Sequence, residues 1–351
     1  MAYQNVGIPR FYVSILQWLK SLGMASYDGG DDWTPSSDAS SLLDINPSST
    51  ITFTAGNNNT GNGDNISYGT NIPLGTIMPT KKNFFMALGH NFNSATVPGL
   101  VVRDNGGTEV CKEEVVNNID GNVYNGFTIM KGDDATDIDD NYLIFSLYGA
   151  SNAYASDIRI GSLLYGTYFD MPHSPDLSLT MTREYGGIKT IQTKGGASLS
   201  NDFGSKPPMW GDAGAWELWH PDTGVANQTL SRSGRRVWDL SFSYLDNHNL
   251  WGSNQSLSLS RFDTDDGITD NDDTGEQGTT GNYSFNLLTD DNFYSQVIHK
   301  TNGLQLPFIF QPDNNDANIQ NFAICKFDSG FKFEQVSMNT YNCKIRIKEI
   351  W

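Results

Sequence analysis

Acidic side chains are the most numerous potential ion ligands in this sequence, and they gather in two clusters. One cluster lies at residues 133–140, and the other contains Asp263, Asp265 and Asp270 in a Gly-rich stretch. Calcium needs several oxygen ligands that converge on one point. The second cluster is not an EF-hand, because its glycine comes one residue early and its twelfth position is Thr274. A looser calcium site at the three aspartates is one interpretation, and a solvated acidic insertion is the favoured one.

Catalytic motifs are missing from the sequence. It contains no GxSxG, HExxH or P-loop pattern, and no two of its five histidines stand at metal-ligand spacing. A glycosidase needs one carboxylic acid in an apolar pocket beside an ionised partner, whereas most acids here stand in Gly- and Asn-rich loops. We therefore expect no enzymatic activity and no cofactor, with the loop-bound calcium as the alternative. A cell-wall or capsule hydrolase is the alternative.

Aromatic and imidazole side chains offer a different chemistry, the recognition of sugars or of other proteins. His90 follows an apolar run and is a candidate glycan contact, although such a histidine more often caps a turn. Trp210, Trp216 and Trp219 lie in an irregular Pro/Gly-rich stretch, where they would stack on sugar rings or cover a subunit contact. The contact between subunits is the favoured interpretation. The candidate assembly residues are Phe11, Trp18, Trp210, Trp216, Trp219 and Trp351.

Composition narrows the class of protein. The 351 residues are 38% hydrophobic and carry a formal net charge of −18. Because so acidic a surface repels nucleic acid, we expect no nucleic-acid partner. No window reaches the roughly 18 apolar residues of a membrane span, so we expect no membrane insertion. Cys111, Cys325 and Cys343 form no disulfide framework and are predicted to be reduced core residues, although Cys325 and Cys343 would approach each other if their strands pair.

Most elements that would position these side chains are predicted to be strands. Short apolar runs between polar loops predict a jelly-roll-like β-sandwich over residues 48–172. Prolines mark a boundary near Pro172, and a second β domain with one helix is predicted over residues 173–351. Its clearest strand is RRVWDLSFSYL, in which Trp238, Leu240, Phe242 and Tyr244 alternate with polar residues.

One helix is predicted near the start of the chain. Phe11, Ile15, Trp18, Leu19 and Leu22 stand at helical spacing, and the glycine that follows is a plausible stop. The polar stretch after it is predicted to be an exposed connector as far as residue 47. Residues 1–47 are thus expected to form an N-terminal arm with a helix and a linker.

Six segments of the sequence form a recognisable set. They are the opening AYQNVGIPRFYV, then HSPDLSLTMTREYGGIKTIQTKGGASLS, GRRVWDLSFSYL, LPFIFQPD, FAICKF and the terminal IRIKEIW. Together they resemble structural proteins of marine tailed bacteriophages. NFFMALGHNF and DIRIGSLLYG are similar to galactose-binding-type jelly-roll modules, and the second half is similar to distal-tail and tail-tube-related proteins. The resemblance implies a mainly β fold of two antiparallel β-sandwich domains with a short N-terminal helix.

The same resemblance implies a role in the virion. It points to a structural subunit of the tail or baseplate that assembles in the host cytoplasm as a homo-oligomeric ring. Its partners would be copies of itself and other tail proteins. The alternatives are an adhesion module that binds a host-surface glycan and a capsid decoration protein, because a jelly-roll fold alone does not determine what is bound.

Overall fold

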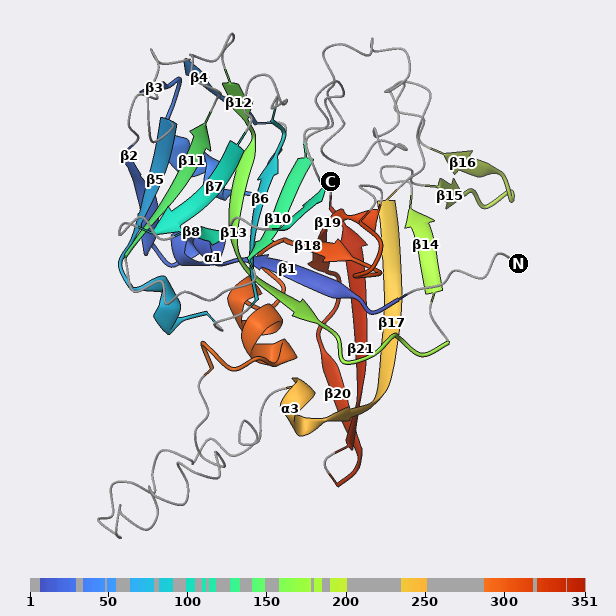
Figure 1. Ribbon diagram of the computed structural model, residues 1–351. Coiled ribbons are helices and arrows are strands. Elements are labelled where there is room, and N and C mark those ends of the chain that lie inside the picture. Colours follow the sequence, from blue (N-terminus) through green and yellow to red (C-terminus); the bar gives the residue numbers. More distant parts are fainter. Residues whose placement is uncertain are drawn as a thin grey trace, which may run out of the picture.

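The chain folds into a mainly β structure in which every strand pairing among the described residues is antiparallel (Figure 1). This confirms the predicted fold class. A computed structural model describes residues 7–29, 34–47, 49–54, 64–78, 82–90, 99–104, 109–111, 114–117, 127–132, 141–148, 158–177, 180–184, 190–200, 235–250, 287–317, 321–338 and 340–350.

The largest sheet has eleven strands and runs through both halves of the chain. In spatial order they are β14 (Thr180–Glu184), β17 (Arg235–Asp246), β21 (Thr340–Glu349), β19 (Ala323–Phe327), β18 (Phe308–Gln311), β1 (Arg10–Ser14), β13 (Ser162–Asp170), β6 (Asn83–Leu88), β10 (Phe127–Gly132) and β9 (Glu114–Asn117), with β20 (Lys332–Ser337) paired on β21.

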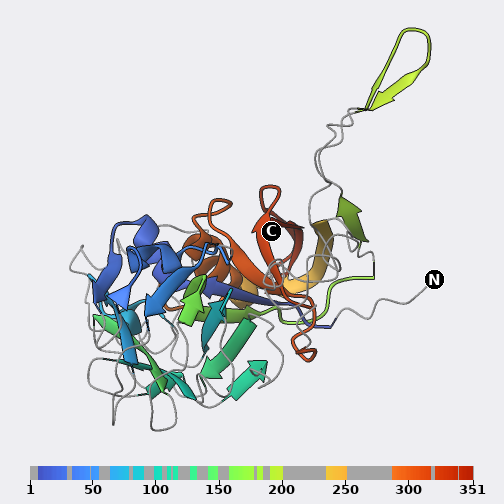
Figure 2. The same ribbon diagram turned by 90° about the horizontal axis from the view of Figure 1, so that it is seen from above.

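Three smaller sheets complete the strands. The five-stranded sheet orders β2 (Ala25–Gly29), β5 (Asp64–Thr70), β11 (Tyr142–Tyr148), β7 (Gly99–Asp104) and β8 (Glu109–Cys111). A three-stranded sheet orders β12 (Ile158–Ile160), β4 (Ile51–Thr54) and β3 (Thr34–Pro35). The two-stranded sheet is a hairpin of β15 (Thr190–Gln192) and β16 (Ser198–Ser200), which stands away from the other sheets in Figure 2.

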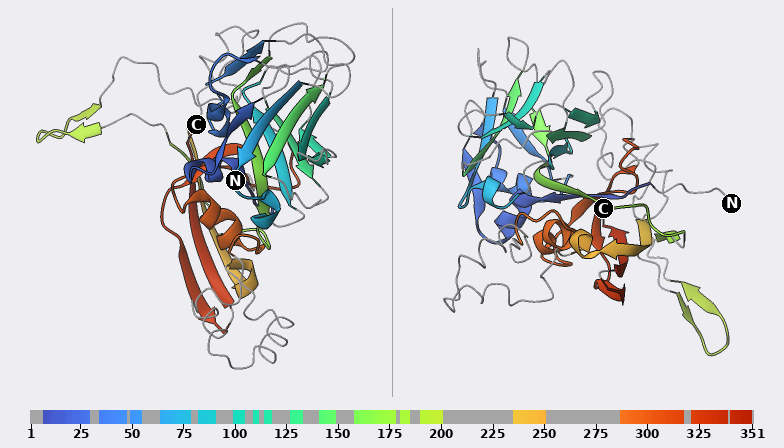
Figure 3. Two further views of the ribbon diagram at one scale, coloured as in Figure 1. Left: turned by 90° about the vertical axis from the view of Figure 1, so that its left-hand side faces the viewer. Right: turned by 60° about the horizontal axis from the view of Figure 1, so that its bottom comes forward.

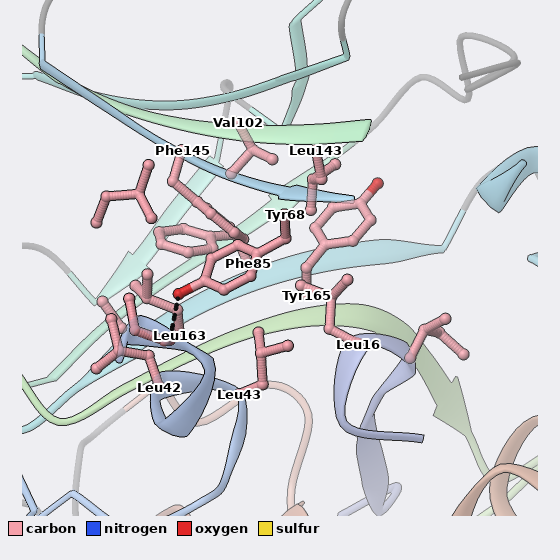
Figure 4. Close-up of a cluster of buried hydrophobic side chains, with 14 of the residues drawn as sticks. Leu16, Leu42, Leu43, Tyr68, Phe85, Val102, Leu143, Phe145, Leu163 and Tyr165 are labelled. Atoms are coloured by element: carbon pink, nitrogen blue, oxygen red, sulfur yellow. Dashed lines mark hydrogen bonds between the residues drawn. The ribbon is translucent and has the colours of Figure 1, made fainter. Parts of the chain in front are cut away.

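The first-half strands of the large sheet pack face to face on the five-stranded sheet. Phe85 and Tyr165 from the large sheet meet Tyr68, Leu143 and Phe145 from the other, as Figure 4 shows. The rings of Phe85 and Phe145 lie 5.0 Å apart. Each large side chain buried in this way contributes about 1.5–3 kcal/mol, so this interface stabilises a β-sandwich in the region where the sequence predicts one.

The N-terminal strand β1 joins the two halves of the large sheet. It lies between β13 of the first half and β18 of the second, with Arg10 opposite Asp170 on one side and Gln311 on the other. Phe11 packs into the second-half core, whereas Tyr12 packs into the core on the opposite face. We call β1 with β13 and β18 the β1 seam. The large sheet thus contains strands from both sides of the predicted boundary near residue 172. The division into two domains stays a prediction.

An ion pair closes the seam at its start. The Arg10 guanidinium donates to both oxygens of the Asp170 carboxylate, at 2.6 and 2.8 Å, and lies over the Tyr168 ring. Gly166 stands opposite Ser14, where a Cβ atom would collide with the backbone of Val13. A glycine here therefore allows the end of β1 to lie directly against β13.

The N-terminal helix is shorter than predicted. Helix α1 (Ile15–Ser21) begins after Ser14, whose hydroxyl accepts a hydrogen bond from the backbone N–H of Gln17. It ends where Gly23 adopts a positive φ of 71°, which confirms the predicted stop. Phe11 belongs to a strand instead, because a strand buried on both faces shows the same unbroken apolar run as a buried helix.

The polar stretch after the helix is not an exposed connector. Its first residues form β2, and the 3₁₀ turn η1 (Ala39–Leu43) buries Ala39, Leu42 and Leu43 in the sandwich core. A further 3₁₀ turn, η2 (Leu74–Thr76), buries Leu74. The predicted exposed connector was wrong because serines and aspartates dominate the composition of this stretch. Its three apolar residues, which the core buries, form no pattern that stands out among them.

Strand β17 confirms the predicted alternation up to one irregularity. Trp238, Leu240 and Phe242 are buried, but the register shifts before Leu245. Tyr244 therefore has a φ of 62° and leaves 85% of its surface exposed, contrary to the prediction. The bulge preserves burial of Leu245 while turning the tyrosine outward.

Short helical segments cover one face of the second half. A π-helix, η4 (Tyr294–Ile298), continues into the 3₁₀ turn η5 (His299–Thr301), and Phe293 and Val297 pack into the core beside Phe11. Figure 3 shows these segments against the sheet, with α3 (Asn247–Leu250) after β17. Within the described residues, no helix combines the length and apolar character needed to cross a membrane.

The cysteines Cys325 and Cys343 are both free and buried, as predicted. Their strands pair, but Cys325 lies opposite Glu349, which is six residues along β21 from Cys343. At about 3.3 Å per residue the two cysteines are separated by roughly 20 Å, which rules out a disulfide between them. The side chain of Cys111 lies outside the described part of the chain.

Candidate functional site

A groove of about 490 Å³ lies on the outer face of the second half. The alternation along β17 and β21 produces it, because the apolar residues point into the core and the polar residues between them point outward. Strand β20 and the loop before it form its remaining wall. The polar lining consists of Asp239, Ser241, Ser329, Lys332, Lys344 and Arg346, beside Leu240, Gly330 and Ile345.

Strand pairing fixes the positions of the charged groups in this groove. Asp239 lies opposite Arg346, and Lys344 lies between Ser241 on β17 and Lys332 on β20. The guanidinium of Arg346 is 3.1 Å from the carboxylate of Asp328 and 3.7 Å from that of Asp239. Neighbouring acids thus partly balance the basic groups.

A second ion-pair set continues from the groove toward β14. Glu184 accepts from Lys348 at 2.6 Å and from Arg346 at 3.4 Å. The hydrogen bond from Lys348 lowers the pKa of the Glu184 carboxyl. These side chains are half exposed, so their contribution to stability is small. Their effect is to hold the arginine and lysine heads in place beside the groove.

The groove is suited to polar contacts rather than to covalent chemistry. No histidine or cysteine is found among the described residues that line it. Its lysine and serine groups can donate hydrogen bonds to hydroxyls, carboxylates or carbonyls of a partner. The arrangement supports binding of a polar surface and offers no paired nucleophile and base.

His90 does not fit the predicted glycan contact. Its side chain is fully buried, and its Nε2 atom lies 2.9 Å from the Thr128 hydroxyl of β10. Burial lowers the pKa of His90 to about 3, so the ring is neutral near pH 7. The imidazole is enclosed in the protein because its preceding strand is central, so it presents no surface to a sugar.

Two predicted assembly residues belong to the chain's own core. Phe11 is fully buried among Phe293, Phe308 and Phe310, with ring centroids 5.2–5.6 Å apart. Trp18 is 5% exposed, and its indole N–H donates to the Asn302 side chain at 3.1 Å. Neither side chain is available to a second subunit, because β1 is paired on both sides and α1 packs its tryptophan against Asn302 and His299 of the same chain.

The other predicted site residues lie outside the described residues. They are Trp210, Trp216, Trp219, Trp351, Asp263, Asp265 and Asp270, together with the acidic cluster at residues 133–140. The interface and calcium interpretations of these positions stay predictions. Among the residues that the structure does describe, no group of three or more His, Cys, Asp or Glu is placed to hold a metal ion.

A buried polar cluster beneath η4 was not found from the sequence. Lys300 is fully buried, and its Nζ atom donates to the Gln296 side-chain oxygen at 2.6 Å. The Thr167 hydroxyl of β13 donates to the same oxygen at 3.2 Å. Desolvation lowers the pKa of Lys300 to about 7, although nearby Asp291 opposes this. The four-residue spacing of Gln296 and Lys300 was a signal, but it is typical of exposed helices as well.

The comparisons with known proteins add no family to this geometry. No family model, no curated protein and no solved structure matches the chain.

Proposed function

We propose that this protein is a structural subunit of a tailed-bacteriophage particle, placed in the tail or baseplate as a homo-oligomeric ring. The observation that carries the proposal is the single antiparallel sheet that passes through both halves of the chain. Because β1 joins β13 to β18 by strand pairing, we infer that the two halves move as one rigid unit. A ring subunit needs such rigidity so that each contact repeats at the same angle.

The character of the surface supports the same role. The large apolar residues of β1, β6 and β13 are buried in the interior, whereas the groove on β17 and β21 presents hydrogen-bonding groups. A ring requires two different surfaces on each subunit, which meet head to tail. The resemblance to distal-tail proteins supplies the location in the particle, the partner tail proteins and assembly in the host cytoplasm.

The full-length chain provides the first test. We expect the purified protein to form closed rings of one size, seen by light scattering after gel filtration and by negative-stain electron microscopy. A strictly monomeric protein at every concentration would contradict the homo-oligomer. Gold-labelled antibodies on intact particles would then locate it, and label on the head would favour a capsid decoration protein.

The groove favours one alternative, an adhesion module that binds a host-surface glycan. Its hydroxyl and charged groups match the hydrogen-bonding needs of sugars. A glycan array with the wild-type chain and a Lys344→Ala variant would test it, with Glu334→Gln as a surface control. Binding that is lost only with Lys344→Ala supports the adhesion role, and no binding above background removes it.

A further inference from the structure

The hairpin of β15 and β16 is a preformed element whose turn fixes its register. The Thr193 N–H donates to the Ala197 carbonyl at 2.9 Å, and the Gly196 N–H donates to the Thr193 carbonyl at the same distance. Gly196 has a φ of 82°, which a glycine adopts at little cost. This turn places Ile191 directly opposite Leu199.

That register gives the hairpin one apolar face. Ile191 is 65% exposed and Leu199 is 53% exposed, although they are cross-strand partners on the same side. The alternating positions Thr190, Gln192 and Ser198 carry polar side chains on the other side. An isolated two-stranded hairpin is only marginally stable in water. A partner that covers the exposed apolar face would therefore stabilise this hairpin.

The charge of this segment complements the rest of the chain. Residues 186–200 contain two lysines and no acidic residue, whereas the whole chain carries a formal net charge of −18. A weakly basic hairpin is therefore attracted to the acidic surface of another copy of the same protein. The hairpin stands away from the body in Figure 2 and Figure 3, which leaves both its faces accessible.

Three exposed large hydrophobic side chains lie near the ends of β17 and β20. Tyr244, Val336 and Met338 are exposed by 85%, 58% and 88%. Strand β21 runs between the first two, because it pairs with β17 on one side and β20 on the other near Tyr341. The backbones of β17 and β20 are thus about 10 Å apart there, because two strand spacings separate them. We call Tyr244, Val336 and Met338 the β20-end patch.

Acidic residues border the β20-end patch. Asp246 and Glu334 are both exposed on the strands that carry it. An apolar patch bordered by carboxylates complements an apolar face that carries a lysine at its turn, Lys194.

We propose that the apolar face of the β15–β16 hairpin docks on the β20-end patch of a second copy of this chain. The two surfaces lie on different parts of the molecule, and a head-to-tail contact between them forms a ring when the rotation from copy to copy closes. This inference rests on the homo-oligomer of the proposed function and names the surfaces that form it. Lys194 would approach the carboxylates of Asp246 and Glu334 in the neighbouring copy.

The test compares two double variants of the same hairpin in the full-length chain. Ile191→Asp with Leu199→Asp places charges on the apolar face, and Gln192→Asp with Ser198→Asp places the same charges on the polar face. We expect the first pair to weaken self-association roughly a hundred-fold or more and the second to change it less than about ten-fold. Light scattering after gel filtration measures both, and circular dichroism verifies that each variant is folded.

The acceptor surface is tested separately with Met338→Asp and with cysteine pairs. Met338→Asp should weaken assembly to a similar extent, and Ile191→Cys mixed with Met338→Cys should form an intermolecular disulfide under mild oxidation. Normal assembly of the Ile191→Asp/Leu199→Asp protein overturns the inference, as does a Met338→Asp variant that assembles normally. Both results leave the homo-oligomer intact, whereas a wild-type chain that is always monomeric contradicts the proposed function itself.

Discussion

The β1 seam and the β15–β16 hairpin are both built from antiparallel strands, but the seam is buried in the protein and the hairpin is exposed. Every residue of β1 is buried and has strand neighbours on both sides, whereas the hairpin strands pair with each other and leave Ile191 and Leu199 exposed. Changes in the seam should therefore affect the free energy of unfolding, and changes in the hairpin should affect assembly. The comparison separates residues that stabilise the subunit from residues that would connect subunits.

The largest effect is expected from Phe11→Ala in the seam. Removing a fully buried ring that contacts four other phenylalanines should lower the free energy of unfolding by about 3–5 kcal/mol. Urea unfolding below the concentration at which the wild type assembles measures this, with Tyr244→Ala as the control because that ring is mostly exposed in the single subunit. Equal losses for the two variants would mean that β1 does not hold the halves together.

A slightly smaller loss of unfolding free energy is expected from Glu349→Gln, which breaks a buried ion pair between β17 and β21. The Arg236 guanidinium donates to both Glu349 oxygens, at 2.9 and 3.1 Å, and both side chains are largely buried. Leaving the arginine without its carboxylate should cost about 3 kcal/mol. Glu334→Gln is the matched control, since its partner Lys332 is exposed and 3.7 Å away. A control that is destabilised as much as Glu349→Gln would refute this account.

Lys300 should make stability depend on pH. Its pKa is lowered to about 7 in the folded protein, so between about pH 7 and 10 the unfolded chain binds the proton that the folded chain has lost. Stability should then rise with pH across this window, by at most about 1.4 kcal/mol per pH unit from this group.

Lys300→Met removes the titrating group and nearly preserves its volume. The difference in free energy of unfolding between wild type and variant, measured by urea titration at pH 7, 8, 9 and 10, isolates the lysine from tyrosines and cysteines that also titrate. We expect the free energy of unfolding of the variant to exceed that of the wild type at pH 7, and this difference to shrink as the pH rises. An advantage that is constant over this range would show that Lys300 is not desolvated.

The smallest effect on stability is expected in the hairpin. Ile191→Ala with Leu199→Ala should change the free energy of unfolding by less than about 0.5 kcal/mol, because both side chains are exposed in the subunit. The measurement belongs below the concentration at which the wild type assembles. A loss of several kcal/mol in the monomer would mean that the hairpin packs on its own chain and would make the two regions alike.

The local sequence pattern was sufficient to predict strands that bury one face and expose the other to solvent. The alternation in β17 and β21, the β class of the fold and the stop at Gly23 all follow from neighbouring residues in the sequence. The hairpin turn is of the same kind, because Gly196 and Thr193 satisfy it without help from the rest of the chain. In these regions side-chain period and turn chemistry act over only a few residues.

Contacts between residues distant in the sequence decided the ion pairs, the central position of β1 and the burial of two candidate site residues. Arg10 pairs with Asp170 and Arg236 with Glu349 only because long-range strand pairing brings them together. The same pairing makes β1 a central strand. It encloses Phe11, a predicted assembly contact, and His90, a predicted glycan contact. An apolar run does not reveal how many of its faces will be covered, because burial depends on neighbours that only the tertiary structure supplies.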